Sequence, residues 1–88
     1  MTTEIVIPVV GKLGNKYDIV QVVEWKAKEG DFVDRDSTIL IVETDKASAD
    51  IPAGASGFLH ILVETGGRFT VGTVAGVIAE TEEELQNL

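Results

Sequence analysis

Short stretches rich in β-branched and aromatic residues run along the chain, and glycine or proline separates many of them. Val, Ile, Thr and Phe suit a pleated, half-buried surface, and no segment before residue 80 keeps a helical period. We therefore predict strands near residues 4–8, 19–27, 32–34, 38–43, 47–52, 57–64, 68–70 and 74–80. Many short strands joined by turns indicate an all-β domain, either a sandwich or a flattened barrel.

The chain repeats itself weakly at an offset of 36 residues. The matched pairs include Gly30 and Gly66, Val33 and Phe69, Ile41 and Val77, and Val42 and Ile78. A repeat of this kind predicts two similar four-strand halves that are related by a pseudo-twofold and share one core. The segment around Lys46 would then join the two halves.

Length and charge narrow the possible functions. The chain of 88 residues is one small domain, and without cysteine it has no disulfide and no thiolate metal site. A net charge of -8 argues against binding to nucleic acid or to an anionic membrane and favours partners with basic patches. No apolar run is long enough to span a bilayer and no signal peptide is visible, so we expect a cytoplasmic location, or the mitochondrial matrix for a processed chain.

The sequence offers few groups for catalysis or metal binding. His60 is the only histidine, and it has no visible triad partner or metal co-ligand, so we expect a surface or boundary residue. The acidic segment 31–36 lacks the spacing of a calcium loop, and no phosphate-binding or dinucleotide-binding motif is present. We predict neither catalytic residues nor a metal site.

The segment Glu43-Thr44-Asp45-Lys46-Ala47-Ser48 lies between two extended arms. It predicts a hairpin turn that holds the Lys46 amine out in water, where a prosthetic group can be attached. Taken alone, a lysine at a hairpin tip commonly serves only solubility and discourages edge pairing.

The context of this lysine carries a family resemblance. Residues 42–48 match the lipoylation motif of the lipoyl domains of 2-oxo acid dehydrogenase complexes, and the chain resembles that family over residues 4–80. The flanking matches are Glu24-Trp25, residues 28–33, Ile51-Pro52-Ala53, Gly57, Gly66 and Gly72. We predict a lipoyl domain over residues 1–80 and an acidic tail or the start of a linker, with a possible short helix, over residues 81–88.

The resemblance implies two four-stranded antiparallel sheets in a flattened barrel with quasi-twofold symmetry. Both termini would lie in one sheet, and the Lys46 turn would stand at the far end in the other. Lys46 would carry lipoate in amide linkage, and Asp45 and Ala47 would be read by the modifying enzyme. Glu43 would help to steer partner enzymes, and loop 11–18 would lie near the turn and contribute to specificity.

By the same resemblance, the domain is a non-catalytic, monomeric carrier that moves acyl groups and electrons on a swinging arm. The implied partners are a thiamine-dependent 2-oxo acid dehydrogenase, an acyltransferase core, dihydrolipoyl dehydrogenase, and a lipoate ligase or octanoyltransferase. A pyruvate or acetoin complex is slightly favoured, although the 2-oxo acid and the length of the parent chain stay open. The alternatives are a biotinyl carrier, whose family brackets its lysine with methionines while this chain has only Met1, and an unmodified β docking module.

Overall fold

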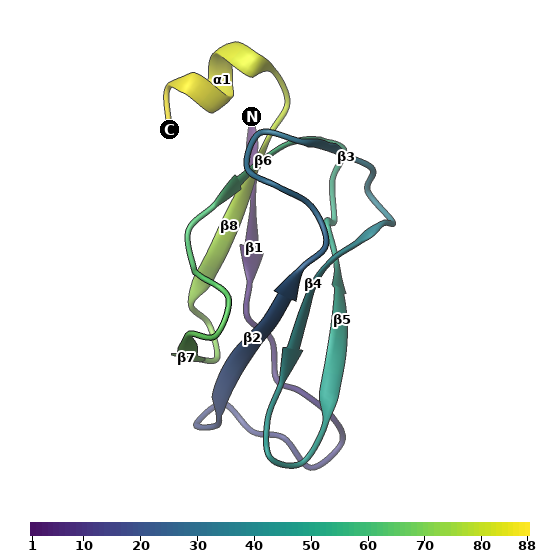
Figure 1. Cartoon of the computed structure of the whole chain (residues 1–88), viewed down its shortest axis with the longest axis vertical. Coiled ribbons are helices and arrows are strands. Elements are labelled where there is room, and N and C mark those ends of the chain that lie inside the picture. The colour runs from purple at the N-terminus through teal and green to yellow at the C-terminus, as the bar shows by residue number, and fades with distance from the viewer.

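Eight strands form in the predicted order, and one short helix follows them (Figure 1). The computed structural model describes all residues from 1 to 88. The elements are β1 (Thr2–Val6), β2 (Ile19–Trp25), β3 (Phe32–Val33), β4 (Thr38–Glu43), β5 (Ser48–Pro52), β6 (Gly57–Ile61), β7 (Arg68–Thr70), β8 (Val74–Ala79) and α1 (Glu82–Gln86). The helix lies within residues 81–88, the acidic segment for which a short helix was one expectation.

The strands form two four-stranded antiparallel sheets, in the orders β1-β8-β6-β3 and β5-β4-β2-β7. Exchanging β1 to β4 with β5 to β8 converts one order into the other, so each half of the chain gives two strands to each sheet. The predicted flattened barrel of two sheets is confirmed, and its pseudo-twofold agrees with the sequence repeat. The hairpin of β4 and β5 joins the two halves.

Two β-bulges lie at positions that the pseudo-twofold relates. In the pairing of β1 with β8 the register shifts so that Ala75 has no partner, and in the pairing of β4 with β5 it shifts so that Ile39 has none. These two residues are 36 positions apart, which is the offset of the sequence repeat. Both side chains are buried, because a bulge places two successive residues against the core.

The space between the sheets is filled by one apolar cluster of 15 buried residues, and no polar or charged residue is buried. Over the first five residues of β2 the side chains alternate, with Val20 and Val22 toward the core and Ile19 and Val23 toward solvent, before a register shift against β4 interrupts the pattern. The structure also explains why position 76 in β8 is occupied by glycine. A β-carbon there would lie 2.8 Å from the carbonyl oxygen of His60 and 3.3 Å from the Trp25 ring, so the tryptophan occupies the space that a larger side chain would need.

Six strands differ from their predicted bounds; β2, β3, β5 and β8 differ by one or two residues at one end, and β1 and β6 differ most. The first strand covers Thr2–Val6 rather than residues 4–8, because its pairing with β8 starts at Thr2 and because Pro8 has no backbone N–H to extend the ladder. The sixth strand ends at Ile61 rather than at residue 64. The chain beyond Ile61 turns toward β7, and the Gly67 amide donates to the carbonyl oxygen of Glu64.

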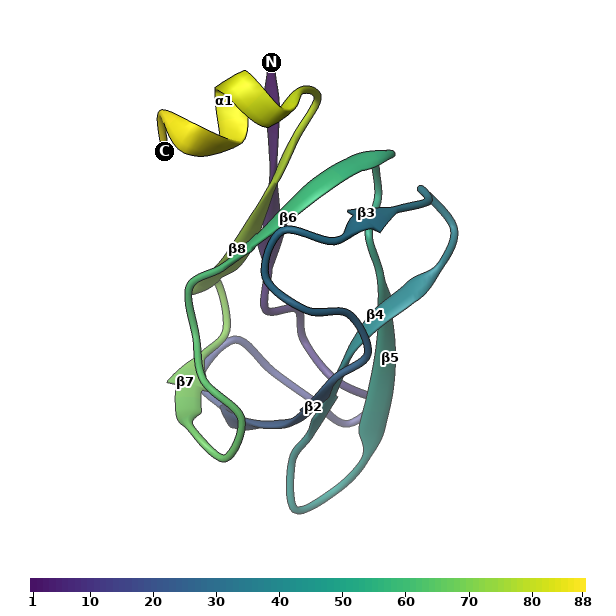
Figure 2. The ribbon, with the colours of Figure 1, turned by 45° about the horizontal axis from the view of Figure 1, so that its top comes forward.

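The two ends of the elongated molecule are formed by different elements. Its principal extents are 39 × 21 × 20 Å. Both termini and α1 lie at one end, and the turn between β4 and β5 lies at the other, beside the loop that joins β1 to β2 (Figures 1 and 2). This agrees with the arrangement that the resemblance implied. No helix has the length and apolar character needed to cross a membrane.

Candidate attachment site at the Lys46 turn

The turn of residues 44–47, called the Lys46 turn below, is held by the hydroxyl of Thr44. This oxygen accepts hydrogen bonds from the amides of Lys46 (3.1 Å) and Ala47 (3.2 Å). The amide of Thr44 donates to the carbonyl oxygen of Ala47 at 2.8 Å, directly beyond the last pair of the ladder, Glu43 with Ser48. Side-chain and backbone bonds together fix the apex of the hairpin, since a threonine hydroxyl can replace a backbone acceptor in a turn.

The Lys46 amine lies at the surface but has one ionic partner. Its Nζ is 3.7 Å from Oδ1 of Asp18, and 41% of the lysine side chain is exposed, against 15% of the aspartate side chain. Its sequence neighbour Asp45 forms no ion pair with it. The amine is therefore accessible, while its position is biased toward the start of β2.

Loop 11–18 packs against the other side of the turn. A β-carbon on Gly11 would lie 2.7 Å from Cβ of Ala47, so the two backbones approach more closely than a side chain at position 11 would allow. Gly11 also has a φ of +75°, a left-handed conformation that favours glycine. The expectation that this loop lies near the turn is confirmed.

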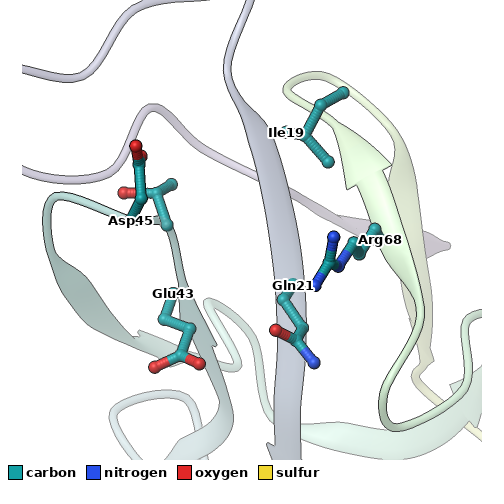
Figure 3. Close-up of a pocket in the computed structure, with 6 residues that line it drawn as sticks. Ile19, Gln21, Glu43, Asp45 and Arg68 are labelled. Atoms are coloured by element: carbon teal, nitrogen blue, oxygen red, sulfur yellow. The ribbon is translucent and has the colours of Figure 1, made fainter.

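A polar groove opens beside the turn on the outer face of the β5-β4-β2-β7 sheet. Its volume is about 420 Å³, and it is lined by Ile19, Gln21, Glu43, Thr44, Asp45 and Arg68. Glu43, Gln21 and Arg68 form a cross-strand row, because Gln21 pairs with each of the other two. Glu43 and Asp45 stand on one wall and Arg68 on the opposite wall (Figure 3). The groove is thus bounded by two carboxylates and one guanidinium.

Not every residue that shapes this site was singled out from the sequence. The structure places Glu43 and Asp45 exposed at the groove and Ala47 half-buried against Gly11. The roles of Thr44 and Asp18 were missed. A threonine directly after a strand and two residues before the apex is a recognisable turn signal, whereas the contact of Asp18 with Lys46 depends on tertiary structure.

His60 lies outside this site, within β6, and its half-buried side chain agrees with the expected surface or boundary position. Its Nδ1 is 3.0 Å from Oε2 of Glu29, whose Oε1 accepts a hydrogen bond from the Ile61 amide at 2.7 Å. Partial burial raises the pKa of Glu29, but the hydrogen bonds from Ile61 and His60 outweigh it and hold the pKa below the ordinary value of 4.5. This pair joins the 28–31 turn to β6.

A family model matches residues 3–80 of the chain. The model is that of the Biotin_lipoyl family, which carries the description "Biotin-requiring enzyme". The chain belongs to this family. The match covers every strand except the first residue of β1, so the Biotin_lipoyl domain is the whole two-sheet body.

The curated relatives of this Biotin_lipoyl domain are components of dehydrogenase complexes. It is 38% identical over 66 residues to dihydrolipoyllysine-residue acetyltransferase component 5 of the chloroplastic pyruvate dehydrogenase complex of Arabidopsis thaliana, covering 74% of this chain and 14% of the relative. It is 32% identical over 71 residues to the acetyltransferase component of the Buchnera aphidicola pyruvate dehydrogenase complex, covering 80% and 17%.

A succinyltransferase component is also similar. The relative in the 2-oxoglutarate dehydrogenase complex of Rickettsia typhi is 33% identical over 81 residues, covering 91% of this chain and 20% of the relative. The chain thus matches between 14% and 20% of the length of these three proteins.

Proposed function

We propose that this domain is a lipoyl carrier and that Nζ of Lys46 is the attachment point of lipoate. The observation that supports this most is an accessible amine at the apex of a hydrogen-bonded turn, in a domain whose relatives are named for dihydrolipoyllysine. The side chains on either side of Lys46 are short, so they leave the amine clear for the active site of a modifying enzyme.

The chemistry at Lys46 is acyl transfer to an amine. After losing a proton, Nζ would attack a lipoyl carboxyl that the modifying enzyme has activated; the C–N bond forms as the bond to the activating group breaks. Once bound, lipoate supplies a dithiolane that takes up an acyl group together with two electrons. The domain itself supplies presentation: it holds the attachment point still, in water and at a fixed place for each visiting enzyme.

The surface around Lys46 suggests how other proteins recognise the domain. We infer that Asp45 and Ala47 are read by the lipoate ligase or octanoyltransferase, since they flank the amine. Glu43 and the groove beside it would face the thiamine-dependent dehydrogenase, the acyltransferase core and dihydrolipoyl dehydrogenase, in the cytoplasm or in the matrix of an organelle. The domain would contribute no catalytic residue to these reactions.

Biotin is the nearest competing cofactor, because the family description covers it. Asp45 and Ala47 flank the lysine where a biotinyl carrier is expected to have methionines, and this favours lipoate. An unmodified docking module is the other alternative.

Intact-mass measurement separates these possibilities. The domain is coexpressed either with a lipoate ligase and lipoate or with a biotin ligase and biotin, and Lys46→Arg is the matched control. We expect one lipoyl increment on the unsubstituted domain, none on Lys46→Arg, and native circular dichroism for both, because this side chain is outside the core. A biotin increment alone would replace the proposal with a biotinyl carrier, no increment would leave the docking module, and a lipoyl increment on Lys46→Arg would refute the site.

A further inference from the structure

Asp18 links loop 11–18 to the residue that the proposed function modifies. Its Oδ1 is 3.7 Å from Nζ of Lys46, and this is the only ion pair that the amine forms. Only 15% of the aspartate side chain is exposed, so Asp18 is confined, while the lysine keeps much of its freedom. The aspartate is therefore the fixed member of the pair.

The same aspartate is bonded into its own loop. Its second oxygen, Oδ2, accepts a hydrogen bond from the Asn15 amide at 3.0 Å, and its amide donates to the Asn15 carbonyl oxygen at 3.1 Å. The Asn15 side chain in turn accepts from the Tyr17 amide at 2.8 Å. The Asp18 carboxylate is therefore part of the hydrogen-bond network that holds the segment from 15 to 18.

The loop also meets the turn at Gly11, and that contact does not depend on charge. Gly11 packs against the Ala47 methyl group, which stays the same whether or not Lys46 is modified. Only the contact of Asp18 depends on the positive charge of the amine. Loop 11–18 thus has one contact that is insensitive to modification and one that is sensitive to it.

We propose that Asp18 is the residue through which loop 11–18 senses whether Lys46 is modified; the proposal rests on Lys46 being the lipoylated residue. In the unmodified domain the ion pair holds the segment 15–18 against the Lys46 turn. Amide formation removes the positive charge, so this attraction ends while the packing of Gly11 on Ala47 remains. The segment then moves more freely beside the attached group.

This release changes a surface that carries exposed apolar side chains. Leu13 is 80% exposed and Tyr17 is 79% exposed, and both belong to the loop that the ion pair restrains. A partner that docks on this end of the domain would meet a restrained loop before modification and an adaptable one after it. Since exposed ion pairs are weak, the expected change in the opening equilibrium is about twofold to fivefold.

Amide hydrogen exchange measures this restraint directly. The reporters are the hydrogen-bonded amides of Gly14, Asn15, Tyr17 and Asp18. Their protection factors are compared in the unmodified domain, the lipoylated domain, Asp18→Asn and Lys46→Gln. We expect about twofold to fivefold lower protection in the last three than in the first.

The set of variants separates the ion pair from a purely structural role of Asp18. Lys46→Gln leaves the bonds between Asp18 and Asn15 intact, so equal protection in Lys46→Gln and the unmodified domain would overturn the proposal even if Asp18→Asn changes. Equal protection in the lipoylated and unmodified domains would also overturn it. Asp36→Asn, in the distant turn between β3 and β4, is the charge-matched control and should change nothing.

Failure of the proposed function gives a different result. If mass measurement shows no lipoylation, the sensing of modification fails with it. Asp18→Asn and Lys46→Gln still decide whether the ion pair restrains the loop.

Discussion

The hydroxyl of Thr44 accepts hydrogen bonds from the amides of both Lys46 and Ala47. Thr44 follows directly after β4, at the point where the chain leaves the ladder. A turn fixed in this way presents Lys46 from one backbone geometry rather than from several. If Lys46 is the lipoylated residue, as proposed, rigidity here matters because the modifying enzyme must find a single amine in a fixed position.

We expect Thr44→Val, which keeps the shape but removes the hydroxyl, to leave two amides without their acceptor. The loss should lower the free energy of unfolding by about 1 kcal/mol, since water can partly replace a bond at an exposed turn. It should also slow lipoylation by the ligase, because the turn samples more conformations. Urea unfolding and a timed mass assay measure the two effects. Thr44→Ser, which retains the oxygen, is the control; slow lipoylation of the serine variant as well would show that the hydroxyl is not the cause.

At the scale of the elements, the sequence was informative wherever local pattern decides structure. The strands and their order followed from β-rich stretches and turn residues, and the halves followed from matched pairs such as Gly30 and Gly66. The bulges that leave Ile39 and Ala75 unpaired could not be predicted, because a register shift depends on the partner strand. The tie between Asp18 and Lys46 was hidden for the same reason: 28 residues separate them, and only the fold brings them together.

Gly11 of loop 11–18 packs directly against Ala47 in the turn of the β4–β5 hairpin. We expect Gly11→Ala to be destabilised twice: by about 1–2 kcal/mol for a β-carbon in the left-handed region, and further because that β-carbon would lie 2.7 Å from Ala47. The matched control is Gly30→Ala. Gly30 also has a positive φ, of +84°, but has no heavy atom within 4 Å of the added β-carbon.

The difference between the two glycine variants isolates the packing of the loop on the turn. Urea unfolding gives the free energies, and chemical shifts of residues 44–48 show whether the hairpin moves. Equal destabilisation in Gly11→Ala and Gly30→Ala, with unchanged hairpin shifts, would mean that the loop and the hairpin are independent.

Over the whole molecule, acidic side chains lie at both ends, but only one end carries Lys46. The chain carries a net charge of -8, and carboxylates occur at both ends of a body 39 Å long. Glu43 and Asp45 flank the groove at the Lys46 end, whereas Glu82 and Glu83 begin the helix at the end where the termini lie (Figure 1). Because the Debye length at physiological salt is about 8 Å, an enzyme that acts on the proposed site at Lys46 should respond to the first pair only.

The separation of these two acidic groups predicts different effects for two substitutions that change the net charge equally. Glu43→Gln and Glu83→Gln each remove one negative charge from an exposed side chain. If a basic surface of the dehydrogenase docks at the Lys46 end, Glu43→Gln should lower kcat/KM for reductive acylation of the lipoylated domain by about twofold at low salt, the size of one charge pair at roughly 8 Å in water. Glu83→Gln should have no effect, and the difference should vanish as salt is raised. Both domains are first verified by mass to be fully lipoylated, which removes any effect on the modifying enzyme. A partner docked at the Lys46 end would be screened from a charge at the other end of a body this long. Equal losses in the two variants would therefore show that overall charge, rather than the face around Lys46, steers the partner.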